Sequence, residues 1–191
     1  MGYTPAYFSF NTDGGRCEEC KGEGTVTIEM QFMADLVLTC ESCHGQRFKP
    51  EILDVLFHEK NVYDVLNMTI NQAIEFFSEH KQKRIVALLK PLQDVGLGYI
   101  KLGQSSSTLS GGENQRLSIA RAFLRTPRLF IFDESTANLD ATTAQKVLRN
   151  IESHAEKIGA GVVYISHDRD VFARCNSTVM LKNPIERQSV A

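Results

Sequence analysis

Two runs of sequence decide the fold: LSGGENQR at residues 109–116 and LFIFDE at residues 129–134. The first run predicts a loop that opens into a helix, because Ser110 suits the N-cap and Glu113 follows three residues later, as in a capping box. Gly111 and Gly112 have no Cβ, so the phosphates of another molecule can approach the backbone there. The free N–H groups and positive dipole end of a helix N-terminus favour an anion. We therefore expect an anion-contacting helix start at Ser110.

The second run predicts a buried strand that ends in two carboxylates, Asp133 and Glu134. A further apolar run at residues 162–165 is followed by His167, and a predicted helix at residues 142–157 lies between the two runs. This order predicts two parallel strands, which places His167 at the same sheet edge as Glu134. Ligands collect at the carboxyl ends of parallel strands, and two adjacent carboxylates repel each other unless a cation is present. The sequence therefore predicts a metal-dependent site at this edge.

The first fifty residues contain two Cys-x-x-Cys pairs with nineteen residues between them. Their thiolates suit a closed, tetrahedral zinc site made of Cys17, Cys20, Cys40 and Cys43. The alternatives are four unligated thiols or a redox pair. Between the pairs, apolar residues from Val26 to Phe32 alternate with polar ones, which predicts a strand with one apolar face. Residues 36–38 can return beside it, so we expect a zinc-pinned hairpin.

The charge of this segment argues against direct phosphate clamping. Six acidic residues lie between Cys17 and Cys43, against a single base, Lys21. Phosphate binding needs the opposite sign. We expect a hinge or regulatory role for the finger.

Composition excludes several broad classes of protein. The 191 residues carry a formal net charge of -2, so there is no general attraction to nucleic acid or membrane. No apolar run is long enough to span a bilayer and no secretory leader pattern is present, so we expect a cytoplasmic location. The sequence contains no Gly-x-x-x-x-Gly-Lys-Ser/Thr phosphate loop. We therefore expect no ATP hydrolysis by this chain alone.

The middle of the chain predicts helices with structural roles. Asn61 and Thr69 are candidate N-caps. An apolar stripe that includes Leu88 is expected to be core, and His154 is expected at the surface. One compact basic patch, residues 80–84, is read as a solvated helix start, with a phosphate contact as the alternative.

The two opening runs resemble the signature motif and the Walker B strand of the ABC-type ATPases. A longer series of motifs in the same order resembles the second half of the UvrA family, the damage-sensing ATPases of nucleotide excision repair; these are GGRCEEC (14–20), DVLNMT (64–69), VGLGYIKLGQ (95–104) and TLSGGE (108–113). The resemblance implies an α/β fold. The implied fold is a partial P-loop ABC-type ATPase domain, built as a parallel sheet with flanking helices. This domain carries an inserted four-cysteine zinc-finger hairpin and a helical signature subdomain. The implied domains are a zinc-finger module at 1–50, a helical connector and signature subdomain at 51–108, and the C-terminal ATPase part at 109–191.

The resemblance also implies roles for individual residues. Glu134 would orient and deprotonate the attacking water, and His167 would contact the γ-phosphate of ATP. Asp133 would hold Mg²⁺ through water. The residues implied to contact nucleotide are Ser110, Gly111, Gly112, Glu113, Gln115, Asp133 and Asp140. The ATP site would be shared, because the signature residues would touch the ATP held by a facing half.

The implied function is that of part of a UvrA-like ATPase, which binds damaged double-stranded DNA and hands it to excinuclease partner subunits. The phosphate loop would then lie upstream of residue 1, and the partner would be the rest of a UvrA-like chain or a second ABC half. Asn114 and residues 118–122 look more like the transporter ATPases, and Ser135 stands where a proline usually follows the two carboxylates. An ABC transporter-type ATPase subunit is therefore one alternative, against which the cysteine pairs argue. A non-catalytic zinc-binding interaction fragment is the other, and the missing phosphate loop favours it.

Overall fold

The computed structural model describes residues 2–180, which form two compact units. The first unit runs to Val86 and also includes Gly98–Ser105; the second contains Ala87–Leu97 and the described residues from Ser106 onward. Residues 181–191 of the third predicted domain lie outside the described part of the chain. The boundaries expected at residues 50 and 108 follow motifs rather than packing, so they remain a prediction.

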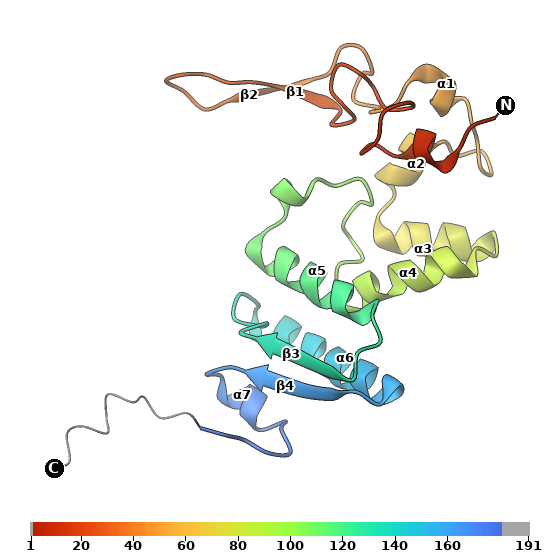
Figure 1. The fold of residues 1–191 in the computed structure, drawn as a ribbon. Coiled ribbons are helices and arrows are strands. Elements are labelled where there is room, and N and C mark those ends of the chain that lie inside the picture. Colours follow the sequence, from red (N-terminus) through yellow and green to blue (C-terminus); the bar gives the residue numbers. More distant parts are fainter. Residues whose placement is uncertain (1, 181–191) are drawn as a thin grey trace. The chain divides into compact units, whose positions relative to one another are not determined.

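The predicted hairpin is present in the first unit. After a short 3-10 helix, η1 (Pro5–Phe8), strands β1 (Thr25–Ile28) and β2 (Leu36–Thr39) pair antiparallel, with Val26 opposite Leu38 (Figure 1). The strand is shorter than predicted, because Phe32 lies in the connection beyond β1, where it is 95% exposed. The expected apolar face exists, but of its residues only Val26 packs against the cysteines.

Three short helices follow: α1 (Pro50–Leu53), α2 (Val62–Asn67) and α3 (Ile70–Glu79). Asn61 and Thr69 cap the last two through reciprocal capping boxes, which confirms both predicted N-caps. Helix α4 (Lys83–Asp94) comes next and contains Pro91. The prediction that its whole apolar stripe is core was wrong for Leu88, which is 53% exposed.

The second unit contains the predicted strand–helix–strand sequence. A 3-10 turn, η2 (Ser106–Thr108), leads into α5 (Gly111–Phe123). Strand β3 (Leu129–Asp133), helix α6 (Ala141–Ile158), strand β4 (Gly161–Ile165) and helix α7 (Arg169–Phe172) follow. β3 and β4 pair parallel, with Asp133 opposite Ile165, so both carboxyl ends meet at one edge. The α/β fold and the parallel pair are thereby confirmed.

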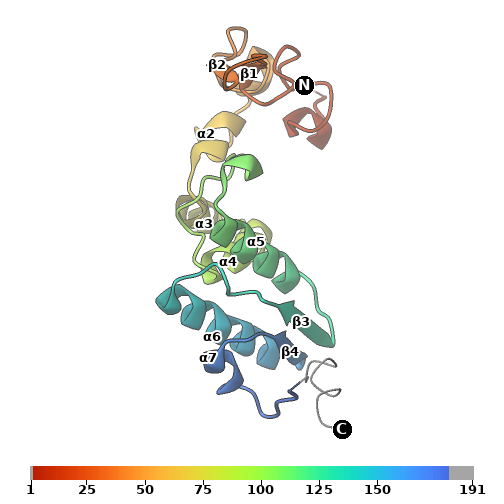
Figure 2. The same cartoon turned by 90° about the vertical axis from the view of Figure 1, so that its left-hand side faces the viewer.

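Only one face of this sheet is covered by described residues. Helix α6 lies along one face of the sheet (Figure 1 and Figure 2). Phe130 and Phe132 are buried, with Phe130 against His154 of α6, and Val147 and Ile151 of this helix are also buried. The alternate residues of β3 point the other way, and Ile131 is 63% exposed. The expectation of a buried strand therefore holds for alternate residues of β3 and was wrong for the others within residues 2–180, because parallel sheets need cover on both sides and here one helix supplies it on one side.

His154 of α6 is half-buried, and the prediction of a surface histidine was wrong. Its ring stacks on Phe123 at 4.4 Å between centroids and lies 6.0 Å from Phe130. Burial lowers the pKa of His154, and the charge of Lys157 adds to the effect. Its Nε2 atom is buried without a hydrogen-bond partner in the described part of the chain. Both observations favour the neutral imidazole in the folded chain.

Within residues 2–180, none of the helices combines the length and the apolar character that crossing a membrane requires.

Candidate functional site

The carboxyl edge of the parallel pair brings Glu134 and His167 together. The amide of Glu134 donates to the carbonyl of Ile165 at 2.9 Å, which continues the pairing one residue beyond β3. His167 Nδ1 lies 2.8 Å from Glu134 Oε1. The hydrogen bond to Glu134, and then its negative charge, raise the pKa of His167. The predicted meeting of these two side chains is confirmed.

The backbone of Glu134 is strained. Its φ of 45° lies in the left-handed region, which costs a non-glycine residue on the order of 1 kcal/mol. Such strain persists where neighbouring contacts fix the backbone. The bond to Ile165 and a contact from α5 do so here.

The contact from α5 is made by Gln115, which lies in the first turns of that helix. Its Nε2 donates to the carbonyl of Glu134 at 2.6 Å, and its Oε1 accepts from the amide of Asn138 at 3.4 Å. The amide side chain thereby joins the start of α5 to the loop after β3. Sequence reasoning named Gln115 as a nucleotide contact but did not anticipate this link, nor the part played by Asn138. A contact between backbone and side chain across nineteen residues has no local sequence signal.

The start of α5 is a capping box, as predicted. Ser110 Oγ accepts from the amide of Glu113 at 3.3 Å, and Glu113 Oε2 accepts from the amide of Ser110 at 2.8 Å. The two glycines that follow differ in their surroundings. A Cβ on Gly112 would lie 2.9 Å from the carbonyl oxygen of Asn138, whereas a Cβ on Gly111 would meet nothing within 4 Å. Gly112 is therefore required for packing, and Gly111 leaves the helix start open to an approaching molecule.

The other two predicted carboxylates differ in role. Asp133 ends β3 with an exposed side chain that makes no hydrogen bond or ion pair to another described residue. Asp140 caps α6, where its Oδ1 accepts from the amide of Thr143 at 3.0 Å. Hydrogen bonds from Thr143 lower the pKa of Asp140. The structure thus places Asp133 beside Glu134 and gives Asp140 a helix-capping role.

The four cysteines of the finger converge into a buried cluster that can hold a metal ion. All four sulfur atoms lie within 4.8 Å of one another, with Cys17 and Cys40 at 3.8 Å and Cys20 and Cys43 at 3.6 Å. A tetrahedral site with Zn–S bonds of about 2.3 Å has sulfur–sulfur edges of about 3.8 Å. Burial is the main cause that raises the pKa of Cys43 to about 12 in the absence of an ion. A buried thiolate here therefore needs a cation, and the donor set fits one.

Backbone hydrogen bonds hold the two cysteine loops together. The amide of Cys17 donates to the carbonyl of Arg47 at 2.8 Å, and that of Cys40 donates to Gly24 at 3.0 Å. Gly24 has a φ of 77°, and a Cβ there would lie 2.9 Å from the carbonyl oxygen of Gly45. The close approach of the loops thus depends on glycine.

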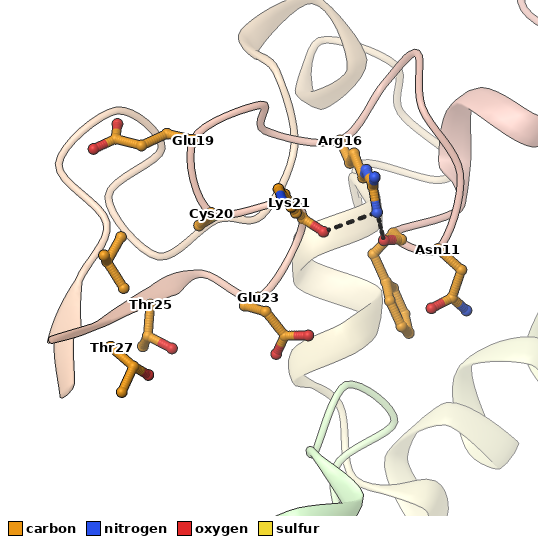
Figure 3. A pocket seen from close by; sticks show the side chains of 10 residues that line it. Asn11, Arg16, Glu19, Cys20, Lys21, Glu23, Thr25 and Thr27 are labelled. Carbon is orange, nitrogen blue, oxygen red and sulfur yellow. Dashed lines mark hydrogen bonds between the residues drawn. The ribbon is translucent and has the colours of Figure 1, made fainter. Parts of the chain in front are cut away.

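A cavity of about 420 Å³ lies beside this cluster (Figure 3). Its lining includes Glu19 and Glu23. The guanidinium of Arg16, which also faces it, is paired with Asp13 at 2.6 Å and donates to the carbonyls of Phe10 and Lys21. Lys21 lines the cavity as well, but the two cations are matched by the two carboxylates, so no net positive charge is left for a phosphate, in line with the expectation from charge.

Comparisons with known proteins agree with the geometry. The ABC transporter family matches residues 18–137. The chain is 41% identical over 183 residues to UvrABC system protein A of Listeria monocytogenes, covering 94% of this chain and 19% of that protein. It is 47% identical over 173 residues to the protein of the same name in Brucella abortus, and this match covers 89% of this chain and 18% of that protein. The chain thus spans about a fifth of the length of these relatives.

A solved structure supports the same relationship. The crystal structure of UvrA2 from Deinococcus radiodurans superposes with a TM-score of 0.80 at 38% identity, covering 91% of this chain and 21% of that chain.

Proposed function

The chain belongs to the ABC transporter family, and from this premise we propose that it provides the signature helix and the catalytic carboxylate of a UvrA-type ATPase in excision repair. The observation that carries the proposal is the contact of His167 Nδ1 with Glu134 Oε1 at the carboxyl edge of β3 and β4, with Gln115 joining α5 to the same backbone. This is where parallel sheets place ligand chemistry. The identity to UvrABC system protein A supports the repair type over a transporter subunit.

Glu134 is the proposed general base. It orients and deprotonates the water that attacks the γ-phosphate, while His167 holds the carboxylate in place and contacts that phosphate. Asp133, whose side chain is exposed and unengaged by other described side chains, is the proposed Mg²⁺ residue, acting through water. Mg²⁺–ATP, when bound, supplies the transferable phosphoryl group and the positive charge that offsets the two carboxylates.

The signature residues are proposed to serve an ATP held by a facing half. Gly111 offers open space at the start of α5, and Ser110 and Gly112 flank it. We propose that Glu113, Gln115 and Asp140 support this surface, since each fixes a backbone segment beside it. ATP would draw the halves together and hydrolysis would release them.

The facing half is proposed to be the rest of a UvrA-like chain or a second ABC half that carries the phosphate loop. The open face of the β3–β4 sheet supports this, because Leu129, Ile131, Val163 and Ile165 are between 44% and 63% exposed. Burying one such side chain fully contributes roughly 1.5–3 kcal/mol. A partner that completes the sheet therefore gains stability from this face.

We propose that the cysteine cluster holds a structural Zn²⁺, because four thiolates in tetrahedral arrangement are the donor set that zinc prefers. In the proposed function the completed protein binds damaged double-stranded DNA in the cytoplasm and passes it to excinuclease partners. The finger would act as a hinge or regulator, since acidic residues outnumber basic ones six to one between Cys17 and Cys43.

ATP turnover after completion tests the proposal. The chain is mixed with a polypeptide that carries the phosphate-loop segment of a UvrABC system protein A, and ATP hydrolysis is compared with that of each component alone. Turnover that appears only in the mixture supports the proposal. No turnover in a mixture that demonstrably associates would favour the non-catalytic zinc-binding protein. Preferential binding of lesion-bearing over intact duplex by the mixture would separate repair from transport.

A further inference from the structure

A second cavity in the first unit has the chemistry of an anion site. Its volume is about 330 Å³, at the lower end of the range for ligand clefts. Its lining contains two cations, three further polar side chains and no carboxylate: Gly45, Arg47, Tyr63, Leu66, Asn67, Lys101, Gly103 and Gln104. The charge of this surface is thus opposite to that of the acidic finger.

Arg47 reaches the cavity from the loop after the second cysteine pair. Its guanidinium lies 5.8 Å from the centroid of the Phe10 ring, and its stem runs past Gly24, where a Cβ would approach Arg47 Cγ to 3.2 Å. A Cβ on Gly103 would lie 3.4 Å from a terminal nitrogen of the guanidinium. Packing on three sides therefore fixes the charged group at the cavity wall.

This guanidinium is half-buried and has no counter-ion. Within residues 2–180, Arg47 forms no ion pair and its side chain makes no hydrogen bond. The Phe10 ring offers the guanidinium only its π face and leaves its N–H donors unused, whereas an oxyanion would accept from paired N–H donors and neutralise the charge. The backbone of Arg47, at φ 69°, is also in the left-handed region, held by the amide of Cys17.

The second cation comes from the loop that follows Gly98. Lys101 forms a β-bridge with Thr69, and the amide of Gly103 donates to the carbonyl of Leu66 at 2.8 Å. Lys101 Nζ lies 3.4 Å from Asn67 Oδ1, a neutral partner that leaves its charge uncompensated. Lys101 forms no ion pair with any described residue either. The loop and the end of α2 thus hold Lys101 at the lining of the same cavity as Arg47.

We propose that this cavity binds a phosphate group between Arg47 and Lys101, with the Tyr63 hydroxyl as a further donor. A guanidinium presents a planar pair of donors to phosphate oxygens and an ammonium adds a compact charge, which is the common composition of phosphate sites. Where the proposed repair function holds, on which this part rests, the phosphate is a phosphodiester of the DNA backbone. The other source of the same chemistry is a free phosphate ion.

The site is tested on the full, zinc-loaded chain by titration with inorganic phosphate at constant ionic strength. Amide NMR signals of Gly45 and Gly103 are expected to shift saturably. The variant with both Arg47→Gln and Lys101→Gln is expected to bind at least tenfold more weakly. The control variant, Lys146→Gln with Arg149→Gln, removes the same charge from the exposed side of α6 and is expected to bind as the parent does.

A second variant keeps both charges and narrows the cavity. In Gly103→Ala the added Cβ lies 3.0 Å from the carbonyl oxygen of Leu66 and 3.4 Å from the guanidinium of Arg47, so phosphate binding is expected to weaken although zinc content is unchanged. Absence of saturable shifts at Gly45 and Gly103 in the parent chain overturns the proposal. So does parental affinity in the Arg47/Lys101 variant.

The source of the phosphate is read from the same variants with a short intact duplex. Loss of duplex binding in the Arg47/Lys101 variant but not in the control assigns the site to the DNA backbone; unchanged duplex binding with lost phosphate binding assigns it to a free ion. Because neither readout involves ATP, failure of the ATPase proposal does not affect the result.

Discussion

Removal of the metal is expected to unfold the finger while leaving the second unit intact. The cysteine cluster is the centre of the finger, and only the half-buried Val26 packs against it from the apolar residues. Half-burial of one valine contributes about 1 kcal/mol. Zinc bound by four thiolates contributes roughly 10–16 kcal/mol of apparent binding free energy at neutral pH. The metal is therefore expected to supply most of the stability of the two cysteine loops, while Phe48 and Ile52 are buried beside them.

Two perturbations remove the metal. One is a strong chelator, and the other is Cys40→Ser, which deletes a fully buried ligand. Cys175→Ser is the matched control, since its thiol is half-buried in the second unit and donates to the carbonyl of Val171. One zinc per chain is expected in the parent and control, measured with a colorimetric metal indicator after denaturation, and much less in Cys40→Ser.

Amide hydrogen exchange reports the structural effect. The amides of Cys17, Cys40 and Lys49 are hydrogen-bonded across the finger and should lose protection on chelation. The amides of β4 should keep theirs. Retained protection of the three finger amides in the metal-free chain would refute the reasoning, because the apolar contacts alone would then hold the finger.

Three further predictions concern the second unit, each measured by denaturation followed by circular dichroism. Tyr164 has a buried hydroxyl without a hydrogen-bond partner in residues 2–180, so Tyr164→Phe should raise the free energy of unfolding by about 1 kcal/mol, and a decrease would contradict this. Burial lowers the pKa of His154 below its ordinary value of about 6.5, so the stability that the neutral ring contributes is complete above pH 6.5 and is lost as the pH falls through the lowered pKa. His154→Phe should therefore flatten the loss of stability in acid, and an unchanged pH profile of stability would count against this role of His154. Ser110→Ala removes the α5 cap and should cost about 1 kcal/mol, whereas Ser118→Ala on the exposed side of the same helix should cost little; equal costs would argue against the capping box.

The local features of the fold were predictable because they depend on residues close in sequence. The capping boxes at Asn61, Thr69 and Ser110 follow from a pattern of two residues three apart. The metal cluster follows from the spacing of its cysteines, and the meeting of Glu134 and His167 follows from the rules for parallel strands. In each case one physical constraint links the pattern to the structure.

Burial and long-range polar contacts were less predictable. An apolar run such as residues 129–132 indicates a strand, but it does not say how many faces are covered, and Ile131 is exposed. The half-buried positions of Arg47 and His154 depend on which elements pack beside them, which a single sequence does not reveal. The packing of Gly112 was not predictable either. The sequence attributed this glycine to the approach of a phosphate, and the structure shows that its contact with the loop at Asn138 also requires a glycine.

The most direct test of the central claim is Glu134→Gln in the protein completed with a phosphate-loop partner. Loss of a general base typically lowers the rate by about 10²–10⁴-fold. With Glu134 as the general base, turnover is expected to fall by this factor while ATP still drives association of the two halves, measured by the size of the complex with and without ATP. Glu156→Gln, on the exposed side of α6, is the control and should leave both unchanged. Undiminished turnover in Glu134→Gln would contradict the account.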